Sequence, residues 1–435
     1  MYEPLFEKDL TICSEIPVLF KNEDEVFFRF SELRGLWRNF LKNLFLSTIF
    51  SCYEKNVFVM VNEGTLNQDF KKLLKISYEL LEMLFSKNCL KFVPKCIETH
   101  KKILFFHETD LEYMLESIFY ENNIFCNFKI SFNIYYNRFI IEKILDEFSV
   151  SFDTIFEFLK KSFILFINYS GYGKMMTKGI GKFKFEDENI NIQPSMIKNR
   201  FNYLFNLVDE ILKLESRKYK EPIIFFEPKD DIFNPYIDKN TLNKIFDHFI
   251  NKYFKNKDIK NHIINDMDKL KLFYIIKSNV IRLKSFWLEE CFPLGELQKE
   301  RRLLHTFLYG FAVSKRGLYQ VEEKRKNIPS IIQFTPFITN DKLYVLFSAF
   351  LSKIYAFDNL LLSNKIKYNG NYINYAWQIR DAKYNGFYLS YLMSFMKDIN
   401  NLLEHIFKFS SLAFNYEREL YRIIKGEDRW SNYYV

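Results

Sequence analysis

A short glycine-rich segment carries the most specific chemical signal in this chain. Four of the twelve glycines in the sequence lie within eleven residues of one another. The residues that form this segment's candidate binding site are Gly171, Tyr172, Gly173, Lys174, Lys178, Gly179, Gly181 and Lys182. Glycine lets a backbone adopt positive φ and come very close to a ligand. Backbone amides beside three ammonium groups suit a polyanion such as a phosphate backbone.

The sequence on either side of this loop predicts a helix before it and a strand after it. An apolar run, Phe163 to Ile167, ends a helix expected from Asp153 to Phe166, and Lys and Phe alternate over residues 182–185 as in a half-buried strand. The order helix, loop, strand excludes the dinucleotide fingerprint and the P-loop, which both run strand, loop, helix. An alternative interpretation is that the glycines only permit a tight, irregular connection.

A second group of candidate binding residues lies near the N-terminus, in the segment from Phe28 to Leu41. Ser31 is a plausible N-cap for a helix. Arg34 and Arg38 are four residues apart and therefore project from one helical face, where guanidinium groups suit bidentate contact with phosphate. Leu33, Trp37, Phe40 and Leu41 supply the apolar stripe on the other side. The alternative is that both arginines belong to a solvated or salt-bridged face.

These two segments together resemble the RAMP superfamily, the RNA-binding proteins of CRISPR effector complexes. The pattern G-x-G-x-x-x-x-x-G-x-G between a helix and a short strand resembles that family's glycine-rich loop. The segment from Phe28 to Leu41 resembles the family motif R-x-x-S-I-R-G-x-L-R-x-W, with Arg29 one residue out of register. A weaker likeness to the R-x-x-S-P-I-x-F strand occurs at residues 323–334. In the family, the helix that begins at the serine packs beside the glycine-rich loop.

Within the family, the chain most resembles the subunit at the head of type III-B (Cmr) complexes, near the 3′ end of the guide RNA. This resemblance implies a non-catalytic subunit that binds CRISPR RNA and complementary target RNA, acts in antiviral defence and assembles with other type III subunits. The alternative is a metal-independent endoribonuclease of the same superfamily that processes CRISPR RNA precursors. His305, beside two arginines, is the best candidate for general acid–base catalysis in that case.

The expected fold class is α+β, with two ferredoxin-like domains that carry large helical insertions. Residues 1–190 form the first domain, which contains the glycine-rich loop, and residues 191–435 form a largely helical second one. A strand is expected from Phe125 to Tyr136 and helical spacing from Asn67 to Glu121. The apolar stretch from Leu10 to Phe20 resembles the first strand of the head subunit. Further helices are expected from Met196 to Leu214, from Asn240 to Phe273 and beyond residue 347, with strands near residues 331–337 and 342–347.

A basic segment in the second half is a candidate for a further RNA surface, because lysines and arginines there are interspersed with aromatic side chains. The residues that we expect to contact RNA are Arg301, Arg302, Lys315, Arg316, Lys324 and Arg325. Several glutamates share this region. A solvated run of mixed charges is therefore an equal alternative.

Composition is compatible with an RNA-binding protein. The chain has 435 residues, a formal net charge of +8 and 19% aromatic residues. Six scattered cysteines do not predict a disulfide framework. A zinc site from Cys89, Cys96, His100 and His107 stays open, although the spacing is long for a zinc knuckle, and we expect no metal or cofactor. The N-terminus shows no targeting signal, and charges interrupt every apolar run, so we expect a cytoplasmic protein without a membrane span.

Overall fold

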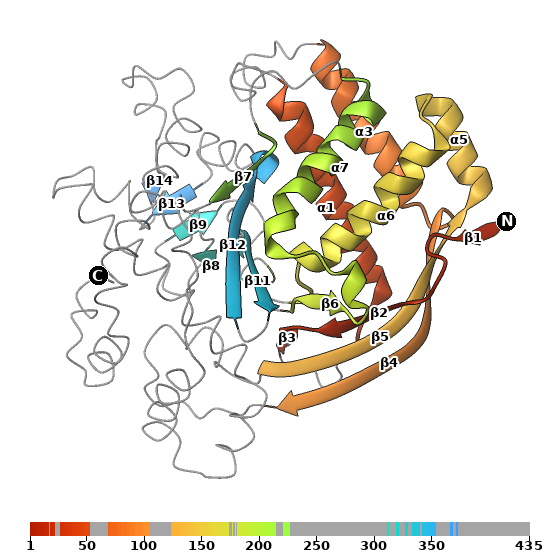
Figure 1. Ribbon diagram of the computed structural model, residues 1–435. Coiled ribbons are helices and arrows are strands. Elements are labelled where there is room, and N and C mark those ends of the chain that lie inside the picture. The colour runs from red at the N-terminus through yellow and green to blue at the C-terminus, as the bar shows by residue number, and fades with distance from the viewer. Residues whose placement is uncertain are drawn as a thin grey trace, which may run out of the picture.

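The computed structural model describes most of the N-terminal half of the chain and parts of the C-terminal half (Figure 1). The described residues are 1–16, 18–21, 27–52, 68–103, 123–173, 176, 179, 181–214, 221–226, 311–312, 319–321, 327–328, 333–339, 342–353, 366–368 and 371–372.

A curved antiparallel sheet underlies the N-terminal half. Its strands are β1 (Tyr2–Pro4), β2 (Leu10–Ser14), β3 (Val18–Lys21), β4 (Leu90–Ile103), β5 (Asn123–Asn137) and β6 (Phe183–Phe185). β5 is central: β4 pairs along one side of it, and β1, β2 and β3 pair in turn along the other. β6 pairs with the remaining edge of β2. The order across the sheet is therefore β4, β5, β2, β6, with every neighbouring pair antiparallel.

The side chains of β5 alternate between the two faces of this sheet. Phe128, Ile130, Phe132 and Ile134 are buried on one face, because a strand directs successive side chains to opposite sides. Figure 1 shows the helices on this concave face, so the main hydrophobic core lies between helices and sheet. The predicted α+β class is confirmed as a mixture of helices and a curled antiparallel sheet, and the strand predicted from Phe125 to Tyr136 is confirmed as part of β5.

The helices present apolar faces to this core. They are α1 (Phe30–Ser51), α3 (Gln68–Leu84), α5 (Arg138–Phe148), α6 (Phe152–Tyr169) and α7 (Ile197–Leu212). Trp37 of α1 is fully buried, meets Phe85 and Phe163 edge to face, and donates a hydrogen bond of 3.3 Å from Nε1 to Ser162 Oγ. α6 begins where expected, because the side chain of Ser151 caps it by accepting from the amide of Thr154. The predicted helices at 153–166 and 196–214 are thus confirmed.

Two predicted elements differ from the structure. Of the region predicted to be helical from Asn67 to Glu121, the structure confirms α3 but shows strand β4 from Leu90 to Ile103; residues 104–122 lie outside the described part. Pro94 is incompatible with a helix interior and lies at a register shift of this outer strand, where a missing N–H is tolerated. The strand predicted from Leu10 to Phe20 is broken between β2 and β3, where the amides of Glu15 and Ile16 both donate to the carbonyl of Lys182.

A second antiparallel sheet comes from the C-terminal half. It has the order β11 (Gln333–Thr339), β12 (Lys342–Phe350), β7 (Ile223–Phe226), which confirms the two strands predicted near residues 331–347. Shorter strands form two further pairings: β8 (Phe311–Ala312) with β10 (Asn327–Ile328), and β13 (Ile366–Tyr368) with β9 (Tyr319–Val321) and β14 (Asn371–Tyr372). Two 3₁₀ turns, η2 (Glu188–Ile190) and η3 (Pro194–Met196), precede α7.

The helix predicted from Asn240 to Phe273 lies outside the described residues, as does most of the helical region predicted beyond residue 347. The domain boundary between residues 190 and 191 stays a prediction. Within the described part of the chain, no helix is both long enough and apolar enough to span a bilayer.

Candidate functional site

The glycine-rich loop leaves the end of α6 and closes on itself before β6. Gly171 forms an isolated antiparallel bridge with Lys182, and the amide of Tyr172 donates to the carbonyl of Gly181 over 2.9 Å. Gly173, Gly179 and Gly181 have φ values of 81°, 80° and 70°. A Cβ at residue 181 would lie 1.9 Å from the carbonyl oxygen of Tyr172. The predicted order helix, loop, strand is confirmed, and the loop's own geometry requires glycine at residue 181.

Tyr172 fastens this loop to the start of α1. Its buried ring stacks on Phe28 with centroids 4.6 Å apart and planes at 26°. Its hydroxyl donates to Glu32 Oε2 and accepts from the amide of Arg29, both over 2.9 Å. Burial raises the pKa of Tyr172, so the phenol stays a neutral donor at physiological pH. The loop and the helix therefore lie side by side, as the family resemblance implies, although 140 residues separate Glu32 from Tyr172.

The first turn of α1 exposes a mixed group of side chains next to this contact. The helix starts at Phe30, with Arg29 as its N-cap in an extended conformation, so the prediction that Ser31 is the N-cap is wrong by two residues. Arg29 has this conformation because its amide is held by Tyr172, which leaves Ser31 inside the first turn. Arg29 and Ser31 are exposed, and the side chain before the buried Phe28, Phe27, is 54% exposed.

Arg34 and Arg38 both face α3 and are engaged within the chain. The guanidinium of Arg34 donates from Nη2 to the carbonyls of Phe85 and Ser86, just after the end of α3, and burial lowers its pKa. Arg38 Nη2 lies 3.9 Å from Glu82 Oε1, and both side chains are largely exposed. These contacts match the alternative interpretation of a paired face. Arg34 supports the end of α3, whereas Arg38 forms a weak surface pair.

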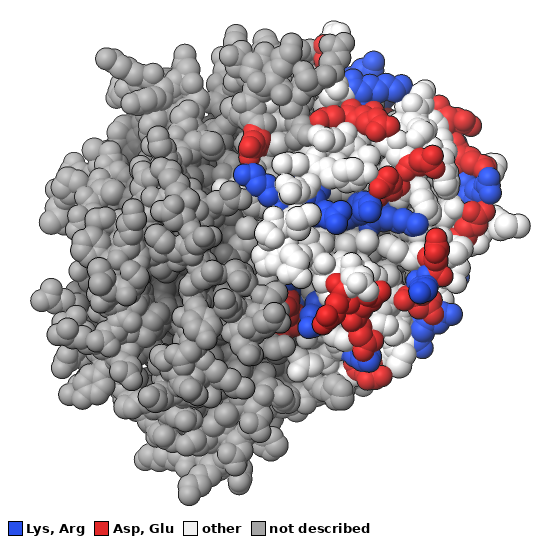
Figure 2. All heavy atoms as spheres, in the orientation of Figure 1, with Lys and Arg blue, Asp and Glu red and all other residues white. Residues whose placement is uncertain are grey.

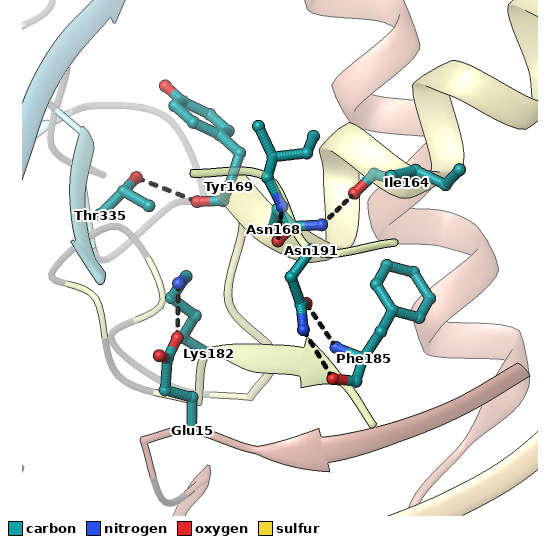
Figure 3. Close-up of polar contacts among 9 residues, drawn as sticks. Glu15, Ile164, Asn168, Tyr169, Lys182, Phe185, Asn191 and Thr335 are labelled. Atoms are coloured by element: carbon teal, nitrogen blue, oxygen red, sulfur yellow. Dashed lines mark hydrogen bonds and ion pairs between the residues drawn. The ribbon is translucent and has the colours of Figure 1, made fainter. Parts of the chain in front are cut away.

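Lys182 is buried, contrary to the expectation that its ammonium would be free to contact a polyanion. Its Nζ lies 2.5 Å from Glu15 Oε2 (Figure 3) and 4.0 Å from the ring centroid of Phe337. Burial lowers its pKa, which the nearby carboxylate partly offsets. Because the charge is neutralised inside the protein, Lys182 ties the loop to Glu15, which follows β2, and to β11, and presents no ammonium to solvent.

The stems of the loop are braced by asparagine side chains. Asn191 forms two hydrogen bonds with the backbone of Phe185 in β6, of 2.9 and 2.8 Å (Figure 3). Asn168, in the last turn of α6, donates to the carbonyl of Ile164 and accepts from the amide of Ile192. The two stems are therefore rigid supports for the residues between them.

Many predicted site residues lie outside the described part of the chain. They are Lys174, Lys178, Arg301, Arg302, Lys315, Arg316, Lys324 and Arg325, together with His305 and His107. Cys89 is buried, which raises the pKa of its thiol to about 12, whereas Cys96 is exposed. Among the described residues, no three histidines, cysteines or carboxylates come together as a metal site.

Acidic and basic side chains are interspersed on the described surface that faces the viewer in Figure 2. This face therefore has no broad basic patch among the described residues. Sequence reasoning missed Phe27, Glu15 and the strand β11 as parts of the site. For Glu15 a signal was present, because it is a single carboxylate inside an otherwise apolar stretch.

No protein-family model and no curated protein matches this chain. Among solved structures, it is similar to a chain of type III-B Cmr-beta bound to cognate target RNA and AMPPnP in the presence of ssDNA, with 12% identity and a TM-score of 0.37, over 82% of this chain and 98% of that one. It is also similar to a chain of type III-B Cmr-beta bound to cognate target RNA, with 12% identity and a TM-score of 0.31, over 79% of this chain and 94% of that one.

Proposed function

We propose that this chain is a non-catalytic RNA-binding subunit of a type III CRISPR effector complex of the Cmr type. It would hold the backbone of the guide RNA, or of its duplex with target RNA, and assemble with the other subunits of that complex. The observation that carries the proposal is the hydrogen-bonded contact of Tyr172 with Arg29 and Glu32. It joins the two segments that independently resemble RAMP motifs.

The order of elements supports a ferredoxin-like first domain. Along the chain the elements run β2, α1, β4, β5, α6, β6, and across the sheet the strands run β6, β2, β5, β4. This βαββαβ order is the ferredoxin-like arrangement, with β1 and β3 added along β5 and with α3 and α5 as helical insertions. We propose that residues 191–435 contain the second such domain, with β7, β11 and β12 among its strands.

The exposed groups at the start of α1 have the chemistry that an RNA strand requires. Arg29 offers a guanidinium to phosphate, and the helix N-terminus offers a partial positive charge. The amides of Phe30 and Ser31 have no hydrogen-bond partner among the described residues, as expected at a helix start. Phe27 offers an aromatic face on which an unpaired base can stack. We propose that Arg29, Phe27 and these two amides, together with Lys174 and Lys178, form the contact surface.

Salt-series binding of the purified full chain to labelled guide-like RNA tests this function. We expect affinity to fall steeply with salt, and Arg29→Ala to reduce the slope of log K against log salt by about one. Arg200→Ala, which removes an exposed arginine of α7, is the matched control and should leave the slope unchanged. A Lys174→Ala/Lys178→Ala double variant should weaken binding further.

The same gels test the absence of catalysis. Intact RNA throughout supports the non-catalytic role. A discrete product that forms without metal and disappears in His305→Ala would replace it with the precursor-processing nuclease. If the wild-type chain fails to bind RNA, both alone and together with its effector subunits, the proposed function is wrong.

A further inference from the structure

Strand β11 places alternate side chains against the glycine-rich loop and its stems. Gln333, Thr335 and Phe337 are two residues apart, so they point to the same face of the strand, and all three are buried. Gln333 Nε2 donates to the carbonyl of Met176 over 3.1 Å. Thr335 Oγ1 donates to the carbonyl of Tyr169 over 3.0 Å (Figure 3). The ammonium of Lys182 lies over the ring of Phe337. One strand thus contacts both stems and the interior of the loop.

Two contacts of this face reach backbone carbonyls of the loop and of its first stem. Tyr169 is the last residue of α6, so its carbonyl lacks a partner within the helix, and Thr335 supplies one. The carbonyl of Met176 accepts from the amide of Gly179 within the loop and from Gln333 across the interface. The side chain of Gln333 therefore holds the carbonyl of Met176 in position.

The strand itself is held independently of these contacts. Each residue from Gln333 to Thr339 has an antiparallel partner in β12. The hydroxyl of Tyr169 forms a further hydrogen bond of 2.7 Å with Ser348 of β12. Both β11 and β12 therefore bind the last residue of α6. Removal of the Gln333 amide should therefore release the loop without detaching β11.

We infer that Gln333 is a positioning residue for RNA binding, which holds the glycine-rich loop in the shape that presents its amides to RNA. Through Gln333 and Thr335, the C-terminal half of the chain controls a site whose residues all lie in the N-terminal half. This inference rests on the proposed function for its RNA-binding consequence, but the control of loop shape is independent of it.

Gln333→Met tests the inference, because it keeps the length and volume of the side chain and removes the amide donor. In the full chain, we expect amide hydrogen exchange to accelerate at Gly179 and Gly181, and RNA affinity to fall roughly fivefold, the effect of one lost neutral hydrogen bond. Exchange in α5, which is remote in sequence from the loop, should not change. Thr335→Val, which removes the hydroxyl, should act in the same direction, whereas Thr335→Ser, which keeps it, should behave as wild type.

The outcomes separate the two claims. Unchanged exchange at Gly179 and Gly181 in Gln333→Met would overturn the positioning role. Faster exchange with undiminished affinity, in a wild-type background that binds RNA, would overturn the link from loop shape to binding while the proposed function stands. If wild type does not bind RNA, the proposed function fails, and the exchange arm still decides whether Gln333 positions the loop. If Gln333→Met does not fold, unchanged exchange at Gly179 and Gly181 in Thr335→Val, compared with Thr335→Ser, would overturn the positioning role of this face of β11.

Discussion

The hydroxyl of Tyr172 lies 2.9 Å from Oε2 of Glu32 and 2.9 Å from the amide nitrogen of Arg29, which joins the glycine-rich loop to the first turn of α1. Tyr172→Phe keeps the ring stacked on Phe28 and removes both hydrogen bonds. We expect a loss of about 1 to 3 kcal/mol in the free energy of unfolding, because the amide of Arg29 loses its acceptor. Urea denaturation measures this, with Tyr78→Phe, a change at an exposed ring, as the control with no expected effect.

Alanine substitution at two glycines should change the free energy of unfolding in opposite directions. Gly35 is exposed within α1 and a Cβ there would meet nothing within 4 Å, so Gly35→Ala should stabilise the chain by about 0.5 to 1 kcal/mol. Gly181→Ala would drive a Cβ into the carbonyl of Tyr172 at a φ of +70°, and should cost more than about 2 kcal/mol or prevent folding. Thermal unfolding of both variants checks the pair. Equal tolerance at both positions would contradict the closed loop geometry.

The lowered pKa of Lys353, which lies just after β12, should make the free energy of unfolding depend on pH. Burial lowers the pKa of its ammonium from 10.5 to about 8. Below pH 8 the folded chain carries the cost of this partly desolvated charge, and between pH 8 and 10.5 the unfolded chain binds more protons, so this cost fades as pH rises. Lys353→Met should therefore stabilise the protein at pH 7 by up to about 3 kcal/mol. The difference should vanish near pH 10.5, and a constant difference across this range would contradict the prediction.

Phe27 should contribute to RNA affinity through stacking and not through charge. Phe27→Ala should weaken binding of single-stranded RNA by about 1 to 3 kcal/mol without altering the salt slope, because stacking releases no counterions. Phe139→Ala is the matched control, since Phe139 is exposed on α5, away from the loop in sequence. Equal effects of the two variants would show that Phe27 has no specific contact with a base.

Much of the N-terminal fold follows from local sequence pattern. The alternation in β5, the serine cap of α6 and the glycines between α6 and β6 are all properties of neighbouring residues, and each predicted the right element. The helical prediction for β4 is wrong because it extends the apolar spacing of α3, from Leu73 to Leu84, into the following segment. What makes it a strand is the pairing with β5, from Leu90 with Tyr136 to Ile103 with Ile124, which is a tertiary contact that local spacing does not encode.

The contact between the glycine-rich loop and α1 follows from the resemblance, whereas the partners of Arg34 and Lys182 do not. The resemblance correctly brought the glycine-rich loop next to α1. Arg34 and Lys182 are expected to face a polyanion, yet each binds a group that is distant in sequence. Arg34 donates to the carbonyls of Phe85 and Ser86, and Lys182 pairs with Glu15, 167 residues away. Whether a lone cation faces solvent or a buried partner is decided by packing, so residue type and spacing alone could not separate the two interpretations.

Hydrogen exchange of the full chain with and without guide-like RNA tests the central claim most directly, because it locates the contact surface without a substitution. We expect RNA to slow exchange in residues 27–36 and in residues 170–184 together, while exchange in α5 is unchanged. Bound RNA that leaves both segments exchanging as in the free protein, with protection confined to other parts of the chain, would contradict it.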